Sequence, residues 1–245
     1  MDIAVQMWSV REDIAALGLG ETLKQVASAG FKTVEICGFY DLTPDELKGL
    51  ADKYGIACVS AHIGYDMLDG QLDTCIGYVK ALGLKNIVIP WLNAERINDI
   101  AVIERLKKIT ARLGGVNCGL GYHNHAHELE GTDLLKKLAS YVPDLKIQFD
   151  IYFAAFVGVN AVEYIKNNNY VRSIHVKELS PDGTDAFNPP LGEGVSDTVR
   201  VIKAAIAANV ENLILEFEKV ADRFGYMREA GKFLKLKTDT NPLQD

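Results

Sequence analysis

The stretch TVEICGFYDLTPDELKGLADKYGIACVSAH (residues 33–62) contains two short apolar runs separated by an amphipathic segment. The runs TVEIC and ACVSAH have the length and composition of buried strands. Between them, Thr43 and Pro44 are a typical helix start, with Glu46 in the first turn and Gly55 at the end. A strand, a helix and a second strand in this order predict parallel pairing through a crossover connection.

The same alternation continues along the whole chain. Short apolar runs alternate with stretches in which apolar residues recur at spacings of three and four, as on one face of a helix. The amphipathic pattern is clearest at residues 21–31, 43–55, 104–114 and 197–210. The predicted strands cover residues 3–8, 33–37, 57–62, 86–91, 118–123, 146–150, 173–177 and 212–218.

Eight such units in 245 residues match the minimal size of a (β/α)8 barrel. The alternative is a doubly wound open sheet, but no GxGxxG follows the first strand and no P-loop signature occurs. We therefore predict an α/β protein with a single (β/α)8 TIM barrel. The catalytic domain is expected over residues 1–235, followed by a polar C-terminal extension over residues 236–245.

Composition narrows the class of protein. The chain is 48% hydrophobic and 24% charged, which is typical of a globular protein, and its net charge of −7 disfavours a nucleic-acid partner. The four cysteines are scattered, which indicates a reduced, cytoplasmic location. The start, MDIAVQMWSVRED, is not typical of a signal peptide, and no apolar run approaches the ~20 residues that span a bilayer. Homo-oligomerisation is left open.

Ionisable or large aromatic side chains lie at the ends of all eight predicted strands. In a (β/α)8 barrel the active site lies at the carboxyl ends of the strands, so these residues are expected to share one rim. All five histidines lie at or just beyond these ends. The rim residues are Gln6, Trp8, Glu35, His62, Trp91, His123, His125, Asp150, His175, Lys177, Glu216 and Glu218.

The rim offers histidine nitrogens and carboxylate oxygens without cysteine. Asp150, His175 and Glu216 end the adjacent strands six, seven and eight. This donor set suits zinc, manganese, iron or cobalt better than calcium. Residues two apart on a strand share a face, so His123 and His125 are expected to form one set.

Several motifs resemble the xylose-isomerase-like sugar phosphate isomerase/epimerase superfamily: AVQMWSVRED, VEICG, YHNHAHELE, QFDIYFA, HVKE, LGEG and ILEFE. The resemblance spans the chain and implies a barrel that binds one divalent metal ion (Mn, Zn, Co, Mg or Fe). The ligands in that superfamily are Glu, Asp, His and Glu from strands five to eight. Asp150, His175 and Glu216 match three of them.

The fourth ligand is where the chain departs from that pattern. Epimerases of the superfamily usually have Glu-Asn-His at the end of strand five, whereas this chain has His123-Asn124-His125. Either His123 takes the ligand position or Glu128 reaches back from the loop. The YHNH variant resembles an inosose-dehydratase-like subgroup that acts on keto-sugars or keto-glycosides.

The resemblance implies a metal-dependent isomerase or epimerase that enolises a small carbohydrate next to a carbonyl. We expect His123 or His125 to carry the proton, Glu216 to be a ligand or second base, and Lys177 to contact a hydroxyl, a phosphate or the developing oxyanion. The alternatives are a metal-dependent lyase (an inosose-type dehydratase or a keto-glycoside eliminase) and a catalytically silent sugar-binding barrel. The expected substrate-binding residues are Gln6, Trp8, Glu35, His62, Trp91 and Lys177.

Several of these residues also have a structural interpretation. His123 and His125 are nearly as well suited to hydrogen bonding with another ligand as to direct metal contact. Glu35 can equally hydrogen-bond neighbouring donors or contact substrate. Trp8 and Trp91 would be packing residues in most proteins but could support a sugar ring at this rim.

Overall fold

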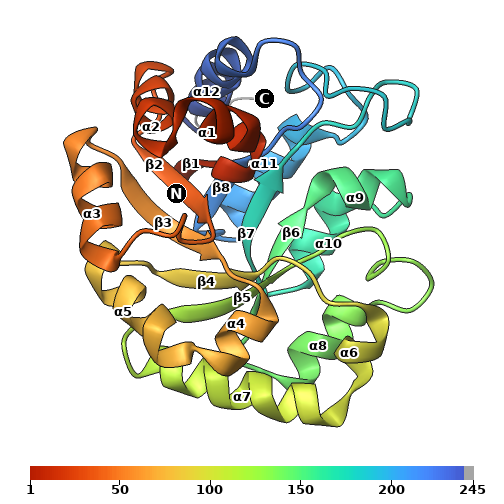
Figure 1. Ribbon diagram of the computed structural model, residues 1–245. Coiled ribbons are helices and arrows are strands. Elements are labelled where there is room, and N and C mark those ends of the chain that lie inside the picture. Colours follow the sequence, from red (N-terminus) through yellow and green to blue (C-terminus); the bar gives the residue numbers. More distant parts are fainter. Residues whose placement is uncertain (240–245) are drawn as a thin grey trace.

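The computed structural model describes residues 1–239 and contains a closed barrel of parallel strands in sequence order, surrounded by helices (Figure 1). β1 pairs with β8 through Asp2–Asn212 and Val5–Leu215, which closes the barrel. The predicted (β/α)8 barrel is therefore confirmed. The strands are β1 (Asp2–Gln6), β2 (Thr33–Cys37), β3 (Ala57–His62), β4 (Asn86–Ile89), β5 (Gly119–His123), β6 (Lys146–Asp150), β7 (Val171–Val176) and β8 (Asn212–Leu215).

Helices cover the outer surface of the barrel, and α12 packs against α2, β1 and β8. Four residues of the expected C-terminal extension, 236–239, continue α12, and residues 240–245 lie outside the described residues. The helices are η1 (a 3-10 turn, Met7–Val10), α1 (Arg11–Leu17), α2 (Leu19–Ser28), α3 (Pro44–Lys53), α4 (Tyr65–Gly70), α5 (Leu72–Leu82), α6 (Ala94–Asn98), α7 (Ile100–Gly114), α8 (Leu134–Tyr141), α9 (Ile151–Phe156), α10 (Ala161–Asn167), α11 (Thr198–Ala207) and α12 (Arg223–Asp239). Across residues 1–239, no helix combines the length and apolar character needed to cross a bilayer.

The predicted start of α3 is present as a capping box. The Thr43 hydroxyl accepts the backbone N–H of Glu46 at 3.3 Å, and the Glu46 carboxylate accepts the backbone N–H of Thr43 at 2.8 Å. Pro44 occupies the first helical position, where its missing N–H is not needed. Leu47 and Ala51 then face the barrel and are buried.

Three strands end at least two residues before the ends of the apolar runs that indicated them. β1 ends at Gln6 because the Gln6 side chain accepts the backbone N–H of Trp8 at 3.0 Å and begins the 3-10 turn. β4 ends before Pro90, which has no N–H to donate to a ladder. β8 ends at Leu215, although the Glu216 N–H still bonds to the Val176 carbonyl at 3.1 Å.

The barrel interior is divided along its axis. Ala4, Val59 and Ile214 form a small apolar group, separate from the large core between the strands and the helices. Because side chains two residues apart share a face, Gln6 and Glu216 follow Ala4 and Ile214 on the same inner side. The interior therefore changes from apolar to polar toward the carboxyl ends of the strands.

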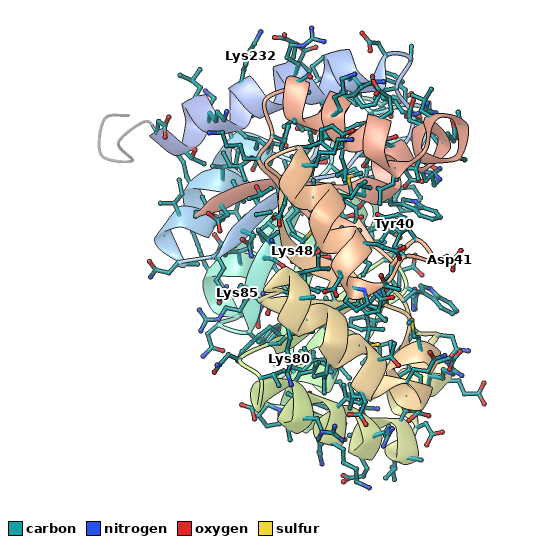
Figure 2. All side chains as sticks on the ribbon, turned by 60° about the vertical axis from the view of Figure 1, so that its left-hand side comes forward. Tyr40, Asp41, Lys48, Lys80, Lys85 and Lys232 are labelled. Atoms are coloured by element: carbon teal, nitrogen blue, oxygen red, sulfur yellow. The ribbon has the colours of Figure 1, made fainter. Side chains whose placement is uncertain are left out.

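The two ends of the barrel are visible from the side (Figure 2). Tyr40 and Asp41, both with φ of 56°, lie in the turn that leaves β2 at the carboxyl end. Lys85 directly precedes β4 at the opposite, amino end.

Candidate active site

A layer of polar side chains is buried at the carboxyl ends of the strands. Glu35, Asp150 and His175 have no exposed surface, and Glu216 is 7% exposed. Buried charges are costly unless they are paired, hydrogen-bonded or bound to a cation. The layer consists of Gln6, Glu35, Ser60, His62, His123, Gln148, Asp150, His175, Lys177 and Glu216.

Four of these residues, His123, Asp150, His175 and Glu216, could bind a metal ion together and are called the donor group. One ligand atom from each of His123, Asp150, His175 and Glu216 lies within 4.8 Å of the others. Oδ2 of Asp150 is buried without a hydrogen-bond partner, and Nε2 of His123 lies 3.9 Å from it. An unpaired buried carboxylate oxygen beside a second carboxylate and two imidazoles fits a divalent cation.

Asp150 also has a structural role through its other oxygen. Oδ1 accepts the backbone N–H of Tyr152 at 2.8 Å and so caps α9. Its own N–H donates to Oδ1 of Asn124 at 2.9 Å, which links the ends of β5 and β6. Burial raises the pKa of Asp150 to about 7, against the opposing effect of the Lys177 charge.

Glu35 is the centre of a hydrogen-bond network beneath the donor group. Oε1 accepts Nε2 of Gln6 at 2.7 Å, while Oε2 accepts the Ser60 hydroxyl at 2.5 Å and Nε2 of Gln148 at 2.7 Å. Burial alone would raise the pKa of Glu35, but the neighbouring His62 and His175 keep it well below its usual range. Glu35 is therefore an ionised carboxylate whose hydrogen bonds are made within the protein.

His175 lies between two carboxylates. Nε2 is 2.7 Å from Oε1 of Glu35, and Nδ1 is 2.7 Å from Oε2 of Glu216. Burial lowers the pKa of His175, but the hydrogen bonds to Glu216 and Glu35 outweigh it and raise the pKa to about 10. Both ring nitrogens are therefore protonated in this structure. A metal ion that displaced the Nδ1 proton would leave the Nε2–H donating to Glu35, an arrangement common around metal-binding histidines.

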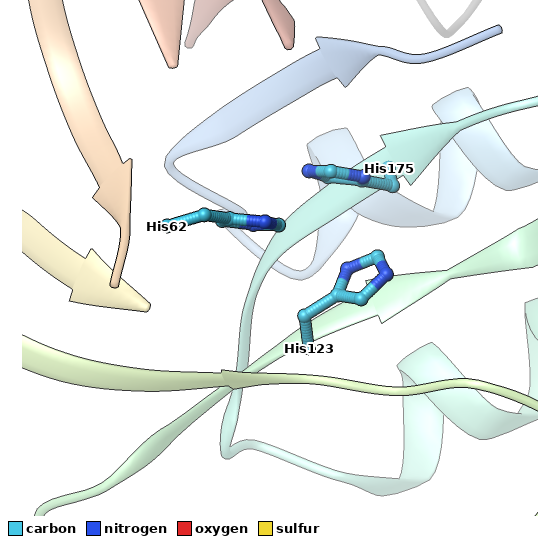
Figure 3. A group of neighbouring side chains, drawn as sticks. All are labelled: His62, His123 and His175. Carbon is cyan, nitrogen blue, oxygen red and sulfur yellow. The ribbon is translucent and has the colours of Figure 1, made fainter. Parts of the chain in front are cut away.

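Gln148 orients two further histidines. Its Oε1 lies 2.7 Å from Nε2 of His62 and 3.1 Å from Nδ1 of His123. The rings of His62, His123 and His175 converge from β3, β5 and β7 (Figure 3). Nε2 of His62 is hydrogen-bonded to Gln148 and lies 3.0 Å from Oε1 of Glu35, whereas Nε2 of His123 lies 3.9 Å from Oδ2 of Asp150.

Lys177 is a buried cation at the end of β7. Its Nζ lies 2.5 Å from Oε1 of Glu218 and 4.7 Å from the centre of the Tyr152 ring. Burial lowers the pKa of Lys177, but the carboxylates of Glu216, Asp150 and Glu218 outweigh it and raise the pKa above the ordinary lysine value. Lys177 is therefore positively charged at neutral pH.

The loop after β7 is fastened to the end of β8. Nδ2 of Asn188 donates to the Glu178 carbonyl at 2.8 Å, and Oδ1 accepts the backbone N–H groups of Glu218 at 2.9 Å and Lys219 at 3.0 Å. This amide fixes the backbone that carries Glu218. It thereby also fixes the carboxylate that pairs with Lys177.

His125 follows β5 and faces the donor group from the loop. Its ring centre lies 5.1 Å from that of His123 and 4.7 Å from that of Phe153, and Nδ1 is buried without a hydrogen-bond partner. Burial lowers the pKa of His125 to about 4. The imidazole is therefore neutral at pH 7 and can accept a proton.

Glu128 points away from the donor group. Its oxygens accept the Tyr122 hydroxyl and the backbone N–H of His125 at 2.8 Å, and one lies 3.2 Å from Nδ1 of His127. Of the two candidates for the fourth ligand, His123 has an atom within the four-residue group and Glu128 does not.

The chain matches a known protein family over most of its length. The family model described as a xylose isomerase-like TIM barrel matches residues 23–237. The chain belongs to this family. A comparison with curated protein sequences finds no match.

Solved structures share the fold of this xylose isomerase-like barrel at low sequence identity. A sugar phosphate isomerase/epimerase from Parabacteroides distasonis ATCC 8503 has a TM-score of 0.79 and 17% identity, covering 97% of this chain and 94% of that one. A D-tagatose 3-epimerase-like protein has a TM-score of 0.73 and 16% identity, covering 98% and 97%. An L-ribulose 3-epimerase has a TM-score of 0.71 and 14% identity, covering 97% and 94%.

The two tryptophans expected at the rim of this xylose isomerase-like barrel are largely exposed. Trp8, in η1, is 43% exposed and stacks under the Arg11 guanidinium at 4.5 Å. Trp91, just after β4, is 52% exposed and lies 6.0 Å from the His127 ring. Both are surface residues and lie outside the barrel core.

Three buried polar residues that belong to this layer or hydrogen-bond to it were not among the expected site residues. Gln148 lies two residues before Asp150 on β6, and Ser60 lies two residues before His62 on β3. Strand alternation was the signal for both, because it puts each on the inner face with a predicted rim residue. Asn124 gave no comparable signal, since its contact depends on the turn that leaves β5.

Proposed function

We propose that this protein is a metal-dependent isomerase or epimerase that moves a proton next to the carbonyl of a keto-sugar. The observation that carries the proposal is the four-strand donor group with the unpaired Oδ2 of Asp150. Family membership and the names of the similar structures support sugar chemistry at this rim.

His123, Asp150, His175 and Glu216 would bind one divalent ion. Two nitrogen and two oxygen ligands without sulfur suit manganese, iron, cobalt, zinc or magnesium. When bound, such an ion supplies a Lewis acid that polarises the carbonyl and a neighbouring hydroxyl. The Nε2–H of His175 donates to Glu35 and fixes the ring orientation from behind.

The chain's own residues perform the proton transfer in this proposal. Neutral His125 accepts the proton at its unpaired Nδ1 and returns it to the neighbouring carbon or to the opposite face. Positively charged Lys177 stabilises negative charge that develops on the substrate oxygen. Glu216 is assigned as a ligand, because its carboxylate is held ionised by Lys177 and His175.

Gln6, Glu35 and His62 are assigned to positioning in this proposal. Their hydrogen bonds are made to one another, to Gln148 and to His175. Trp8 and Trp91 are assigned to stacking against a sugar ring, because both rings are exposed.

Metal analysis and solvent deuterium exchange test the proposal. Purified protein should contain about one divalent ion per chain, removable by chelator, and should exchange deuterium into a keto-sugar next to its carbonyl. Absence of exchange across a keto-sugar panel would favour the catalytically silent sugar-binding barrel.

The proton carrier is tested by His125→Gln. This variant should retain the metal while exchange falls about 100-fold to 10,000-fold, as expected for loss of a general base. His127→Gln, which changes a half-buried histidine of the same loop, is the control and should exchange normally. Normal exchange by His125→Gln would remove His125 from the mechanism.

A lyase is the second candidate function. The observation that favours it is the imidazole of His123 at the end of β5, where epimerases that use two glutamates have a carboxylate. The same enolate could then lose a β-substituent in place of regaining the proton. An unsaturated product, detected by absorbance or mass, would identify the lyase.

A further inference from the structure

We propose that the substrate is an uncharged keto-sugar or keto-glycoside and that phosphate esters are excluded. This inference rests on the proposed function, since it concerns what the same site accepts. It follows from the loops after β7 and β8, where the positions that could receive a phosphate are occupied by the chain's own carboxylates.

In many (β/α)8 barrels a phosphate binds at the loops after strands seven and eight, beside a helix N-terminus. In this chain the carboxylate of Glu178 occupies that position before α11. Oε1 accepts the backbone N–H of Gly192 at 2.8 Å and the Thr198 hydroxyl, and Oε2 accepts the Ser196 N–H at 3.3 Å. Glu178 has no exposed surface, so these donors are already used by an internal carboxyl group.

The loop is packed closely around that carboxylate. A Cβ atom at Gly194 would lie 2.1 Å from the Leu179 carbonyl and 2.4 Å from Oε2 of Glu178. No space for a phosphate group remains between Gly194 and Glu178.

The helix that follows β8 begins in the same way. Oδ1 of Asp222 accepts the backbone N–H of Gly225 at 2.9 Å, in the first turn of α12. A second internal carboxylate therefore lies at the other helix start where a phosphate could bind. It adds negative charge to that position.

The cations at this rim are also paired. Within the described chain, the segments that join each strand to the next helix contain two lysines, Lys177 and Lys219, and no arginine. Lys177 lies 2.5 Å from Glu218, and Lys219 lies 2.7 Å from Oδ2 of Asp185. In each pair the carboxylate balances the ammonium charge, so neither lysine offers net positive charge to a phosphate dianion.

The arginines that begin the neighbouring helices are engaged as well. Arg11 lies 3.6 Å from Oε2 of Glu218 and donates to the Trp8 carbonyl at 2.9 Å. Arg223 pairs with Glu12 and, at 3.4 Å, with Asp13.

The rim presents exposed aromatic rings and buried carboxylates to the substrate. The carboxylates of Glu218, Asp185 and Asp222 lie at this side of the rim and disfavour a phosphate dianion there, whereas the charges of Asp150 and Glu216 would be balanced by the bound metal ion. The apolar face of an uncharged sugar can pack against an aromatic ring instead. The exposed rings near this end are Trp8, Trp91, Phe156 and Phe187.

Paired substrates test the inference on the manganese-loaded enzyme. Deuterium exchange is measured for D-fructose and D-ribulose and for the terminal monophosphate ester of each. We expect exchange with at least one free sugar and a kcat/KM at least about 100-fold lower for its ester, the size of a like-charge penalty in a desolvated site. Faster exchange with an ester would overturn the inference and leave the proposed function standing. No exchange with any member would overturn the proposed function, and the inference with it.

Inorganic phosphate provides a test that does not depend on turnover. It should neither raise the Tm of the metal-loaded protein nor inhibit exchange competitively, because a ligand that binds the folded state raises Tm. A saturable rise in Tm would show a phosphate site and overturn the inference.

Asp222→Asn tests one of the two internal carboxyl groups. The amide keeps an oxygen for the Gly225 N–H but removes the charge, so free-sugar exchange should be unchanged while the discrimination against esters narrows about threefold. Asp144→Asn is the matched control, because Asp144 is an exposed acid before β6 at the other end of the barrel. An equal effect of the two variants would contradict a role for the α12 start in phosphate exclusion.

Discussion

The two halves of the rim use the same residue types in different ways. In the first half, from β1 to β3, the side chains of Gln6, Glu35 and Ser60 hydrogen-bond within the protein. In the second half, from β5 to β8, Oδ2 of Asp150 and Nδ1 of His125 are buried without a partner. The paired atoms position neighbouring groups, whereas the two unpaired atoms are those to which the proposed function assigns the metal ion and the substrate proton.

The pKa values follow the same division. Glu35 is fully buried, yet its partners keep its pKa well below the usual range. Asp150 is equally buried, and burial raises its pKa to about 7. At a barrel rim, a buried carboxylate is a strong candidate for a functional residue when its neighbours do not offset the rise in pKa that burial causes.

Asp150→Asn tests this difference between the two halves of the rim, and it should have the largest effect of the variants. The amide can still cap α9, but the variant should lose the metal and at least about 1000-fold in activity. Without metal it should be more stable than the unchanged chain, because an uncompensated buried charge is removed. Calorimetry with and without metal measures both effects.

The control for that variant is Asp99→Asn. Asp99 caps α7 through the N–H of Ala101 at 2.8 Å, the same contact that Asp150 makes with α9, but it is exposed. It should bind metal normally. Full metal content in Asp150→Asn would instead show that the unpaired oxygen is not a ligand.

The variants His123→Ala and Glu128→Gln test which of these two residues is the metal ligand contributed by β5 or its loop. We expect His123→Ala to bind metal far more weakly and Glu128→Gln to bind it normally, because Glu128 bonds to Tyr122 and to the His125 backbone. Metal titration of both variants makes the measurement. The opposite result would show that Glu128 reaches the metal and that the β5 loop rearranges on binding.

Glu35→Gln tests the paired half of the rim. Metal affinity should fall about 10-fold to 100-fold, the usual effect of losing a carboxylate that orients a metal-binding histidine. Glu128→Gln serves again as the control, since it also removes a buried carboxylate near the rim. An unchanged affinity in Glu35→Gln would mean that His175 does not need its Nε2 partner.

Trp91→Ala should have the smallest effect. The Trp91 ring is exposed and lies near His127 in the loop after β5. Its loss should therefore weaken substrate binding only, so KM should rise a few-fold while kcat and metal content stay unchanged. Tyr141→Ala, an exposed aromatic at the end of α8, is the control. A loss of metal in Trp91→Ala would contradict its assignment to the substrate side.

The fold was predictable because its signals are local. Apolar runs, helix caps and glycines indicated each unit, and the number of units indicated a closed barrel. The strand ends were less predictable, since the turn at Gln6 depends on a side-chain hydrogen bond and not on hydrophobicity.

The donor group was partly predictable for the same reason. Asp150, His175 and Glu216 lie at or next to strand ends, where position alone determines that they meet. The orientation of Glu128 was not predictable, because it depends on a loop that bends back to Tyr122. The hydrogen bonds that occupy both carboxylate oxygens of Glu35 were not predictable either, because they come from residues of β1, β3, β6 and β7 that meet only in the folded chain.

Asn188 has a consequence for how such a protein can diversify. Its amide holds the backbone of Glu218 and Lys219 through atoms near the base of the loop after β7. The exposed residues 181–184 at the loop tip can then accumulate substitutions without shifting the β8 end, whereas Asp185 is tied to Lys219. Loops that carry specificity on a rigid frame are where related proteins vary most. Under the proposed function, substitutions at this tip would change which sugar is accepted while the donor group keeps its geometry.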